Sequence, residues 1–211
     1  MLSHARAQCH ISSVIHPDTE LRRVGSQIGY GVAATAPIPR GTITWVRDDL
    51  DQCLDVETVS RLPEVLRVAL KRYAYRDLDE TYVLCWDHAR FNNHSCQPAC
   101  RTVGDFDIAV RDIAAGEELT IEYAVINVLD VFDCRCGAEH CRGEVHSSDA
   151  LRYGEAWDAE ILAAVRRAPT IAQPLETLFA GSTTLASALA DAVAGRPITL
   201  PASRDLILPS Q

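Results

Sequence analysis

Three cysteines fall within eight consecutive residues, in the stretch CRCGAEHCRG with spacing C-x-C-x4-C; they are Cys134, Cys136 and Cys141. Two thiols one residue apart, a glycine for a tight turn and a third thiol after a short loop can all face one ion. A structural zinc ion takes four soft or borderline ligands in a tetrahedron. Since only three thiols are local, we expect a distant fourth ligand, with Cys96 first and Cys100 or His140 as alternatives.

A second group of chemically capable residues lies in RFNNHSCQPAC, which holds Asn, Asn, His, Ser and Cys in consecutive positions. Asn92, Asn93 and His94 suit neither a core strand nor an ordinary surface loop, although a loop that satisfies its own backbone groups is the alternative. Eight cysteines in a chain without an export signal favour a metal or free thiols over disulfides. We therefore expect zinc to pin residues 134–143 against the loop of Cys96, and thiols without metal are the alternative.

Two further features are weak when each is taken alone. The run Gly29-Tyr30-Gly31 would let the backbone approach a ligand closely, because glycine has no Cβ, but a plain hairpin turn is the simpler explanation. The helix that follows a dinucleotide fingerprint is missing from the pattern, which excludes that fold. Tyr123 ends GEELTIEY, where a tyrosine at a strand end usually packs half-buried.

The elements that must position these residues are short in the first half of the chain. From Thr19 to Val46, glycines and prolines separate β-rich runs, so we expect a strand, a glycine turn and further strands. Apolar residues recur every three or four positions over residues 55–74, which predicts helix, with a second helix starting at Pro63. Strands return after Thr81; the clearest strands and their turn are 106–110, 119–123 and Gly116.

After Ser147 the composition shifts to Ala and Leu, which predicts helices and then an irregular tail. The expected elements are a helix at 155–167 stopped by Pro169, a short helix at 174–180 ended by Gly181, a helix at 183–194 between Ser182 as N-cap and Gly195 at the C-cap, and a tail at 197–211. Leu185, Leu189 and Val193 share one face of the last helix, and such a face must be buried. We expect it to pack on the rest of the chain or on a second copy in a homodimer.

Length, composition and charge restrict the function classes. A chain of 211 residues with 47% hydrophobic and 23% charged residues fits one globular domain, with or without an appendage. Its net charge is −9 and its Lys and Arg residues form no run longer than a pair, so we expect no direct nucleic-acid binding. The apolar runs are too short for a membrane span, and Met1–His10 has no signal-peptide core. We expect a soluble intracellular protein, cytoplasmic with the nucleus not excluded.

Taken together and in order, four stretches resemble the SET-domain protein lysine methyltransferases that carry a post-SET zinc segment. IGYGVAATAPIPRGT is similar to the G-x-G stretch, RFNNHSCQPAC to R-F-x-N-H-S-C-x-P-N-C, GEELTIEYA to G-E-E-L-T-x-x-Y, and CRCGAEHCRG to the post-SET cysteines. The resemblance covers roughly residues 19–144. It implies a mainly β fold with α, the β-clip SET fold of several small sheets around a pseudoknot-like core, plus a C-terminal helical extension.

The resemblance also implies a division of the chain and a fourth metal ligand. The expected parts are a SET domain at 19–127 with a helical insert at about 55–76, a post-SET zinc segment at 128–146, and a helical extension with an irregular tail at 147–211. Cys96 matches the fourth zinc ligand of the family. One loop would then couple metal-dependent folding to cofactor binding.

The implied cofactor is S-adenosylmethionine. The residues that match the family's cofactor contacts are Gly29, Tyr30, Gly31, Arg90, Phe91, Asn93 and His94. Tyr123 matches the catalytic tyrosine, and we place Tyr82 beside it in the catalytic site, with packing in a strand as the alternative. Ile121 stands in the substrate channel where the family usually has Phe or Tyr, and Phe132 is the expected lid of that channel.

The function implied is methyl transfer to the side-chain nitrogen of a lysine in a protein or peptide. Two alternatives stay open: transfer to a small-molecule or carrier-bound amine, and a catalytically silent SET fold that binds a basic peptide. Ala99 replaces the usual Asn after Pro98, and Ile121 leaves the number of methyl groups added undetermined.

Overall fold

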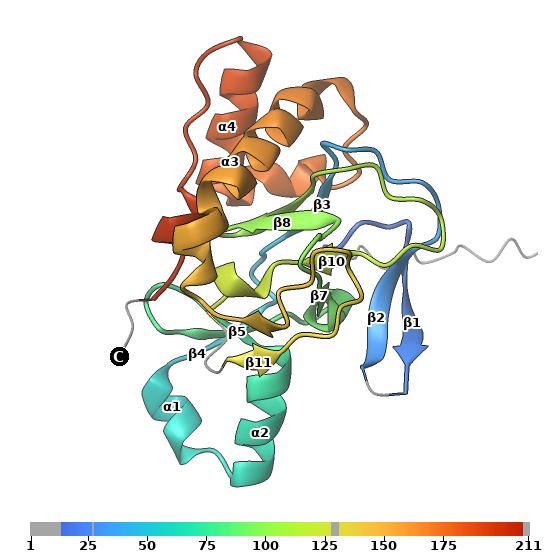
Figure 1. Cartoon of the computed structure of the whole chain (residues 1–211). Helices are drawn as coiled ribbons and strands as arrows, with labels where there is room; N and C mark the ends of the chain where they lie inside the picture. Colours follow the sequence, from blue (N-terminus) through green and yellow to red (C-terminus); the bar gives the residue numbers. More distant parts are fainter. Residues whose placement is uncertain (1–13, 27, 128–130, 209–211) are drawn as a thin grey trace, which may run out of the picture.

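Glycine and proline interrupt the first half of the chain so often that its strands stay short. In the computed structural model, which describes residues 14–26, 28–127 and 131–208, twelve strands pair into five small sheets. Figure 1 shows the sheets between two short helices on one side and the C-terminal helices on the other. The expected mainly β fold with a helical C-terminal region is confirmed. Met1–His10 and residues 128–130, on which two sequence expectations fall, lie outside the described residues.

The glycine-rich stretch near the start forms an antiparallel hairpin of β1 (Thr19–Gly25) and β2 (Gly29–Ala34), as expected. A three-stranded antiparallel sheet follows, in the order β3 (Ile43–Val46), β9 (Phe106–Ala109), β8 (Cys100–Val103). All residues of these three strands are buried because both faces of the sheet are covered, which is the pattern of a central sheet.

The helical insert stands on a second three-stranded sheet. This sheet has the order β4 (Gln52–Leu54), β6 (Tyr82–Leu84), β5 (Tyr75–Arg76), and the helices are α1 (Val56–Arg61) and α2 (Glu64–Tyr73). Asp55 caps α1 through the backbone N–H of Thr58. Pro63 is the N-cap of α2 rather than its first helical residue, because its extended backbone separates the two helices. Val59, Leu70 and Tyr82 form the small core beneath them.

The two polar motifs lie side by side in a parallel pair of strands. In this pair β7 (Asn93–His94) lies against β10 (Thr120–Ile121), with Asn93 opposite Thr120 and His94 opposite Ile121. The 3-10 helix η1 (His88–Phe91) leads into β7. The strand expected at 119–123 is shorter than predicted, because Tyr123 opens a second 3-10 helix, η2 (Tyr123–Val125), capped by the Glu122 carboxylate.

The cysteine-rich segment runs between two very short strands, β11 (Phe132–Asp133) and β12 (Glu144–Val145), and is otherwise irregular, as expected. The chain then enters the long helix α3 (Asp149–Arg167), the 3-10 helices η3 (Ala168–Thr170) and η4 (Glu176–Gly181), helix α4 (Thr183–Val193), and η5 (Ser203–Asp205) in the tail. Helix α3 begins six residues before the predicted 155, and the short helix predicted at 174–180 is 3-10 rather than α. Gly154 lies inside α3 and packs against the tail, where an added Cβ would meet Ser203 at 3.4 Å, an ordinary van der Waals contact.

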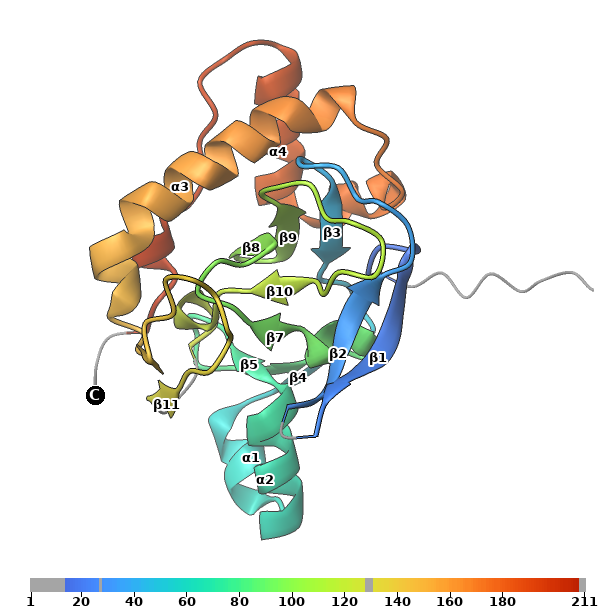
Figure 2. The ribbon, with the colours of Figure 1, turned by 45° about the vertical axis from the view of Figure 1, so that its right-hand side comes forward.

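The C-terminal helices are part of the core. Figure 2 shows α3 lying obliquely across the sheet of β3, β9 and β8, with α4 behind it. Ile161, Ala164 and Val165 of α3 and Leu185 of α4 are buried against apolar side chains of that sheet, such as Phe106. Ser182 caps α4 as predicted, accepting from the backbone N–H of Leu185. The prediction for Val193 was wrong: it is 73% exposed, because the helix turns this side to solvent.

Among the described residues, every helix is too short or too polar to cross a lipid bilayer. The packing of α3 and α4 on the sheet agrees with the expectation that these helices cover the rest of the chain. Whether a second copy binds them stays a prediction.

Candidate functional site

Four cysteine sulfurs converge at the end of the parallel strand pair. The Sγ atoms of Cys96, Cys134, Cys136 and Cys141 all lie within 4.8 Å of one another. Cys96 follows β7 by two residues, and the other three come from the segment between β11 and β12. The backbone N–H of Cys96 donates to the sulfur of Cys136, and the N–H of Arg142 donates to the sulfur of Cys96, each at 3.4 Å. The fold thus supplies the distant fourth thiol.

This donor set fits a structural zinc ion. Four sulfurs at about 2.3 Å from zinc in a tetrahedron lie roughly 3.8 Å apart, and the sulfurs of Cys96 and Cys134 are 3.7 Å apart. Neither alternative ligand joins the cluster. The thiol of Cys100 is buried on β8, where it accepts from the hydroxyl of Thr44, and His140 is exposed.

His94 lies between the cysteine cluster and Tyr123. Its Nδ1 accepts from the backbone N–H of Tyr123 at 3.2 Å, so the ring proton belongs on Nε2, which lies 3.4 Å from the sulfur of Cys96. Burial, and then the charge of Arg142, lower the pKa of His94 to about 3, so the imidazole is neutral. The side chain is 3% exposed, and its role in the described structure is to join two parts of the protein rather than to face a ligand.

A buried carboxylate anchors the cysteine segment to the strands. Glu122 follows β10 and is fully buried, and the guanidinium of Arg142 donates to both of its oxygens, at 2.8 and 3.0 Å. Arg142 also contacts Asp149 at the start of α3, and its guanidinium lies over the rings of Tyr153 and Trp157. Helix α3 therefore holds Arg142, the residue that follows Cys141.

Tyr123 lies where two pockets meet. Its hydroxyl donates to the carbonyl of Asn92 at 2.7 Å, and burial raises the pKa of the phenol to about 12. The inner pocket is lined by Trp45, Tyr75, Cys85, Thr102, Asp107 and Ile121, among others. The hairpin pocket is lined by Ile28, Gly29, Tyr30, Phe91 and Asn93. Five residues line both pockets: Arg72, Tyr73, Arg90, Asn92 and Tyr123.

The hairpin pocket depends on a close approach between β2 and the parallel strands. The amide nitrogen of Asn93 donates to the carbonyl of Tyr30 at 3.0 Å and to the carboxylate of Glu118 at 2.6 Å. A Cβ on Gly31 would overlap the Glu118 carboxylate and lie 2.8 Å from that amide nitrogen. Gly29 has φ +93°, a conformation that favours glycine. These two glycines are needed for physical reasons that the sequence pattern alone left weak.

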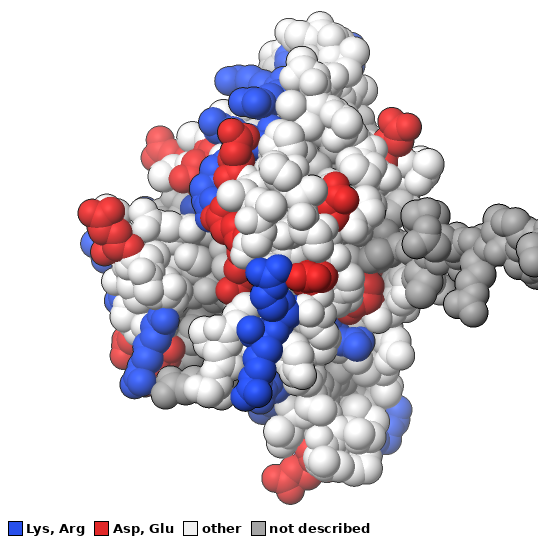
Figure 3. All heavy atoms as spheres, turned by 90° about the vertical axis from the view of Figure 1, so that its right-hand side faces the viewer, with Lys and Arg blue, Asp and Glu red and all other residues white. Residues whose placement is uncertain are grey.

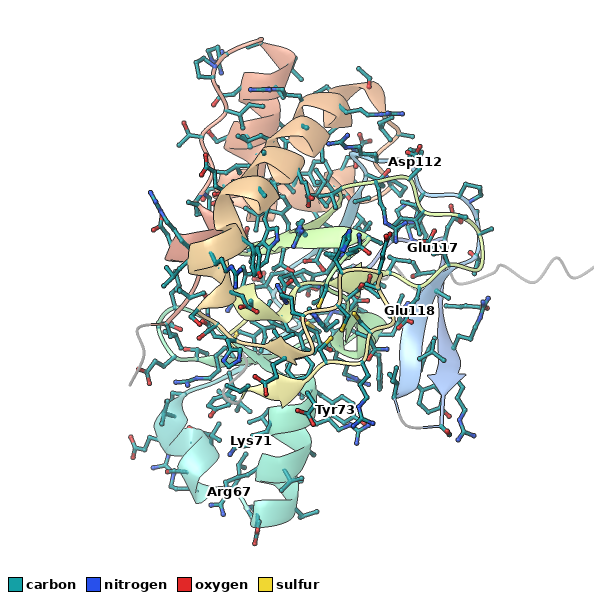
Figure 4. All side chains as sticks on the ribbon, viewed as in Figure 1. Arg67, Lys71, Tyr73, Asp112, Glu117 and Glu118 are labelled. Carbon is teal, nitrogen blue, oxygen red and sulfur yellow. The ribbon has the colours of Figure 1, made fainter. Side chains whose placement is uncertain are left out.

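The structure brings most of the predicted cofactor, catalytic and channel residues to the two pockets, but Gly31, His94, Tyr82 and Phe132 line neither pocket. Gly29, Tyr30, Arg90, Phe91 and Asn93 line the hairpin pocket. Gly31 and His94 lie behind it, as described above. Figure 4 shows Tyr73 at the end of α2 nearer the sheets and Glu117 and Glu118 on the stretch leading to β10.

Three other predicted residues lie at different depths. Ile121 lines the inner pocket, as expected of a channel residue. Phe132 packs edge-on against His94 and beside Tyr123, with ring centroids 5.6 and 5.7 Å apart. Tyr82 lines neither pocket: it is buried beneath α1 and α2, and Arg76 lies over its ring. Tyr82 therefore packs in a strand, as the alternative interpretation of the sequence predicted.

Sequence reasoning missed several residues that the structure brings to the site. Asp107 and Trp45 read as parts of a core sheet, and Glu122 reads as the polar member of an alternating strand. One feature of the sequence could have indicated Arg142. It directly follows Cys141, in a segment too short to fold without contacts to the rest of the chain.

Comparison with known proteins agrees with this geometry. Residues 29–124 match the SET domain family, and these residues include β2 of the glycine hairpin, both polar motifs and Tyr123. The chain contains a SET domain. The match ends before the cysteine segment, so the post-SET assignment depends on the four converging thiols and on the resemblance.

Several relatives of the chain have names that state histone substrates. The mouse protein "Histone-lysine N-methyltransferase, H3 lysine-36 specific" is 30% identical over 151 residues, 61% of this chain and 5% of the relative. "Histone-lysine N-methyltransferase ASHH2" of Arabidopsis thaliana is 40% identical over 68 residues, 26% of this chain and 4% of the relative. "Histone-lysine N-methyltransferase, H3 lysine-4 specific" of Schizosaccharomyces pombe is 46% identical over 63 residues, which are 26% of this chain and 7% of the relative. The chain therefore matches less than a tenth of each of these proteins.

Proposed function

We propose that this protein is an S-adenosylmethionine-dependent N-methyltransferase whose acceptor is the side-chain amine of a lysine in a protein or peptide. The observation that carries the proposal is the position of Tyr123, which lines both pockets and is fixed by hydrogen bonds at its hydroxyl and at its backbone nitrogen. A group-transfer enzyme needs a donor and an acceptor that meet at one point. Two pockets with a shared wall supply that arrangement.

The hairpin pocket fits the cofactor. Gly29, Tyr30 and Asn93 offer backbone carbonyls, an aromatic ring and an amide, and Tyr30 is 53% exposed, so its ring is free to cover a ligand. Bound there, S-adenosylmethionine would supply a methyl group on a sulfonium, which an uncharged amine can take up. Phe132, packed beside Tyr123 and His94, would close the same region from the cysteine segment.

Tyr123 acts in this proposal as a neutral hydrogen-bond acceptor and orienting group. Its proton is committed to the carbonyl of Asn92. The lone pairs of its oxygen are left to accept an N–H of the incoming amine and to contact the methyl hydrogens, through weak C–H···O interactions. Since the phenol has a pKa of about 12, it does not remove the proton of the amine near neutral pH. Its contribution is orientation.

The acceptor must lose a proton before it can attack. The side-chain amine of a lysine in water has a pKa of about 10.4, so most of it is charged at neutral pH. Beside Tyr123, the positive sulfonium of the bound cofactor and the buried side chain of Ile121 would disfavour a second positive charge and shift the amine toward its neutral form. Holding the neutral amine in line with the methyl group replaces a bimolecular encounter.

Zinc would act on structure in this proposal. With four thiols as ligands the coordination shell is full, and no position is left for a substrate. The ion would hold residues 134–141 against β7, and through His94 and Phe132 it would fix the neighbourhood of Tyr123.

Protein substrates are favoured over nucleic acids as partners. The relatives' names state histones as substrates, and a histone tail is basic while this chain carries a net charge of −9. On the face that carries β1 and β2, Figure 3 shows acidic and basic side chains interspersed rather than one basic block. Histone substrates would place the protein at chromatin, and the cytoplasmic location expected from the sequence gains no support from these relatives.

The decisive experiment measures product mass. The protein, loaded with zinc and S-adenosylmethionine, is incubated with a library of lysine peptides from histone tails and with a panel of small primary amines. Gains of about 14 mass units, one methyl group, on a peptide lysine, lost in Tyr123→Phe, are the expected result. Transfer to the small amines alone would identify a metabolite methyltransferase. Cofactor binding by calorimetry without transfer to any acceptor would identify a silent binding module.

A further inference from the structure

The floor of the inner pocket carries a negative charge. Asp107 lies on β9 opposite Trp45 of β3, lines the pocket, and is 3% exposed. One of its oxygens accepts from the hydroxyl of Thr102 at 2.6 Å. Within residues 14–26, 28–127 and 131–208, no Lys, Arg or His side chain forms an ion pair with its carboxylate at 4.0 Å or less. A buried carboxylate with a single hydroxyl partner is rare in a core, because its desolvation is not offset.

The carboxylate nevertheless keeps its charge near neutral pH. Burial, with a further contribution from Asp87, raises the pKa of Asp107 to about 6, against the opposing hydrogen bond from Thr102. At a pH of about 8 it is therefore ionised. The charge faces the inner pocket. This pocket shares Tyr73, Arg90 and Tyr123 with the hairpin pocket, so a ligand can reach it from there.

The other titratable groups inside the pocket are neutral at that pH. Burial raises the pKa values of the Cys85 thiol and the Tyr75 and Tyr123 phenols. The rings of Trp45 and Tyr75 pack edge-on at 6.3 Å, and the indole nitrogen and the Tyr75 hydroxyl have no hydrogen-bond partner among the described residues. An aromatic wall above one carboxylate is the surrounding that a cation prefers.

The rim of the pocket has the opposite sign. Lys71, Arg72 and Arg90 line it, and all three are exposed. Their charges act through water and are screened by salt, whereas the charge of Asp107 acts in a region of low dielectric. The buried charge therefore decides what binds at the floor.

We propose that Asp107 is the counter-ion for the ammonium group of the acceptor and determines the specificity of the inner pocket for alkylammonium side chains over neutral ones of the same shape. The inference rests on the proposed function, in that the inner pocket is taken as the acceptor's. Asp107 gives the arriving lysine, before it loses its proton, a partner in the pocket. A neutral alcohol or amide of equal length leaves the carboxylate unpaired and binds more weakly.

The test uses n-butylammonium, which reproduces the lysine side chain, and n-butanol, its neutral isostere. The chain has three tryptophans, so the indole N–H region of a ¹⁵N–¹H spectrum holds at most three indole signals. The Trp45 signal, assigned with Trp45→Phe, reports on the pocket, and the signals of Trp86 and Trp157 serve as internal references. Both probes are titrated at a pH of about 8 into the zinc-loaded full chain, into Asp107→Asn, and into Asp49→Asn, which removes an exposed carboxylate.

We expect n-butylammonium to shift the Trp45 signal of the wild type and of Asp49→Asn with the same affinity, at least tenfold tighter than n-butanol. In Asp107→Asn the two probes should bind alike. Equal affinities of the two probes for the wild type would overturn the proposal. This outcome needs no variant, so the proposal stays testable even if Asp107→Asn misfolds. The assay involves no methyl transfer. Discrimination by Asp107 in a protein without transfer activity would refute the proposed function alone, whereas transfer activity without discrimination would refute this inference alone.

Discussion

The guanidinium of Arg142 donates to both carboxylate oxygens of Glu122, at 2.8 and 3.0 Å, and Glu122 is fully buried. This pair joins the cysteine segment to the strand end that precedes Tyr123. The rings of Tyr153 and Trp157 on α3 cover the same guanidinium. This contact thus sets where the cysteine segment ends.

Arg142→Lys should loosen the cysteine segment although it keeps the charge. One guanidinium nitrogen donates to both oxygens of Glu122 while a second faces Asp149 and the plane lies over two aromatic rings. The single nitrogen of an ammonium cannot do all of this at once, so Glu122 is left underpaired in a buried position. We expect zinc loss to a chromophoric chelator to become at least tenfold faster and the melting temperature to fall. Arg135→Lys, at an exposed position of the same segment, is the matched control and should behave as the wild type. Equal release rates in the two variants would refute the anchoring role.

Cys96→Ser should remove the zinc ion or weaken its binding strongly. It deletes one of four thiols that converge within 4.8 Å, and three ligands do not complete the tetrahedron. Metal analysis by mass spectrometry after dialysis should give close to one zinc per chain for the wild type and a small fraction of that for the variant. Cys53→Ser changes an exposed thiol outside the cluster and should keep its zinc. Full occupancy in Cys96→Ser would mean that another residue supplies the fourth ligand.

Tyr123→Phe should separate catalysis from cofactor binding. The variant keeps the ring that packs beside Phe132 but loses the hydroxyl held by Asn92, so the amine loses its orienting group. We expect single-turnover methyl transfer to fall by roughly 10²-fold or more, while the calorimetric affinity for S-adenosylmethionine stays within a few-fold. Asn93→Ala should reverse the order and weaken cofactor binding first. Turnover of Tyr123→Phe near that of the wild type would remove the residue from the mechanism.

Gly31→Ala should damage the hairpin pocket. The added methyl group would overlap the Glu118 carboxylate, so the hydrogen bonds of Asn93 to Glu118 and Tyr30 could not both persist. Gly25→Ala adds the same methyl group to the same hairpin with no atom within 4 Å, and it is the control. We expect at least a tenfold loss of cofactor affinity in the first variant and no change in the second, measured by calorimetry. A similar affinity in both variants would show that the cofactor does not depend on this approach.

Asp107→Asn should stabilise the protein above a pH of about 6. The folded-state pKa of Asp107, about 6, lies above the ordinary aspartate value of about 3.8, so ionisation opposes folding, and the wild type loses stability as pH rises through this interval. Two pKa units correspond to roughly 3 kcal/mol, an upper estimate at a pH of about 8 that should vanish near a pH of about 3.5. Urea unfolding of both proteins at the two pH values tests this. A wild type more stable than Asp107→Asn at the higher pH would mean that the carboxylate has an unseen partner.

The sequence predicted the parts of the fold whose signals are local. Turn residues such as Gly116 and caps such as Ser182 were placed correctly, because each meets a requirement of its own backbone. The four-cysteine cluster was also predictable, since three of its members are neighbours in the sequence and the fourth lies in a recognisable motif.

What escaped prediction depends on long-range packing. Val193 has helical spacing with Leu185 but faces solvent, and periodicity alone does not say where the apolar face ends. Tyr82 and Tyr75 carry the same side chain in one small sheet, yet only Tyr75 reaches the inner pocket. Asp107 was missed, because nothing in the sequence indicates that the acidic residue of this short apolar strand lines a buried pocket in the middle of a sheet.

The parallel pairing of β7 with β10 limits how the chain can be made. Asn93 and His94 pair with Thr120 and Ile121 across the β8–β9 hairpin that separates them in the sequence, and two residues on each side give that pairing little strength of its own. The cluster partners of Cys96, which are Cys134, Cys136 and Cys141, are synthesised later. The helix α3 that covers the sheet of β3, β9 and β8 is synthesised later still. During synthesis the site residues therefore leave the ribosome well before anything can hold them in place. We expect nascent chains to stay exposed to chaperones until α3 has emerged, whatever the intrinsic speed of each local step.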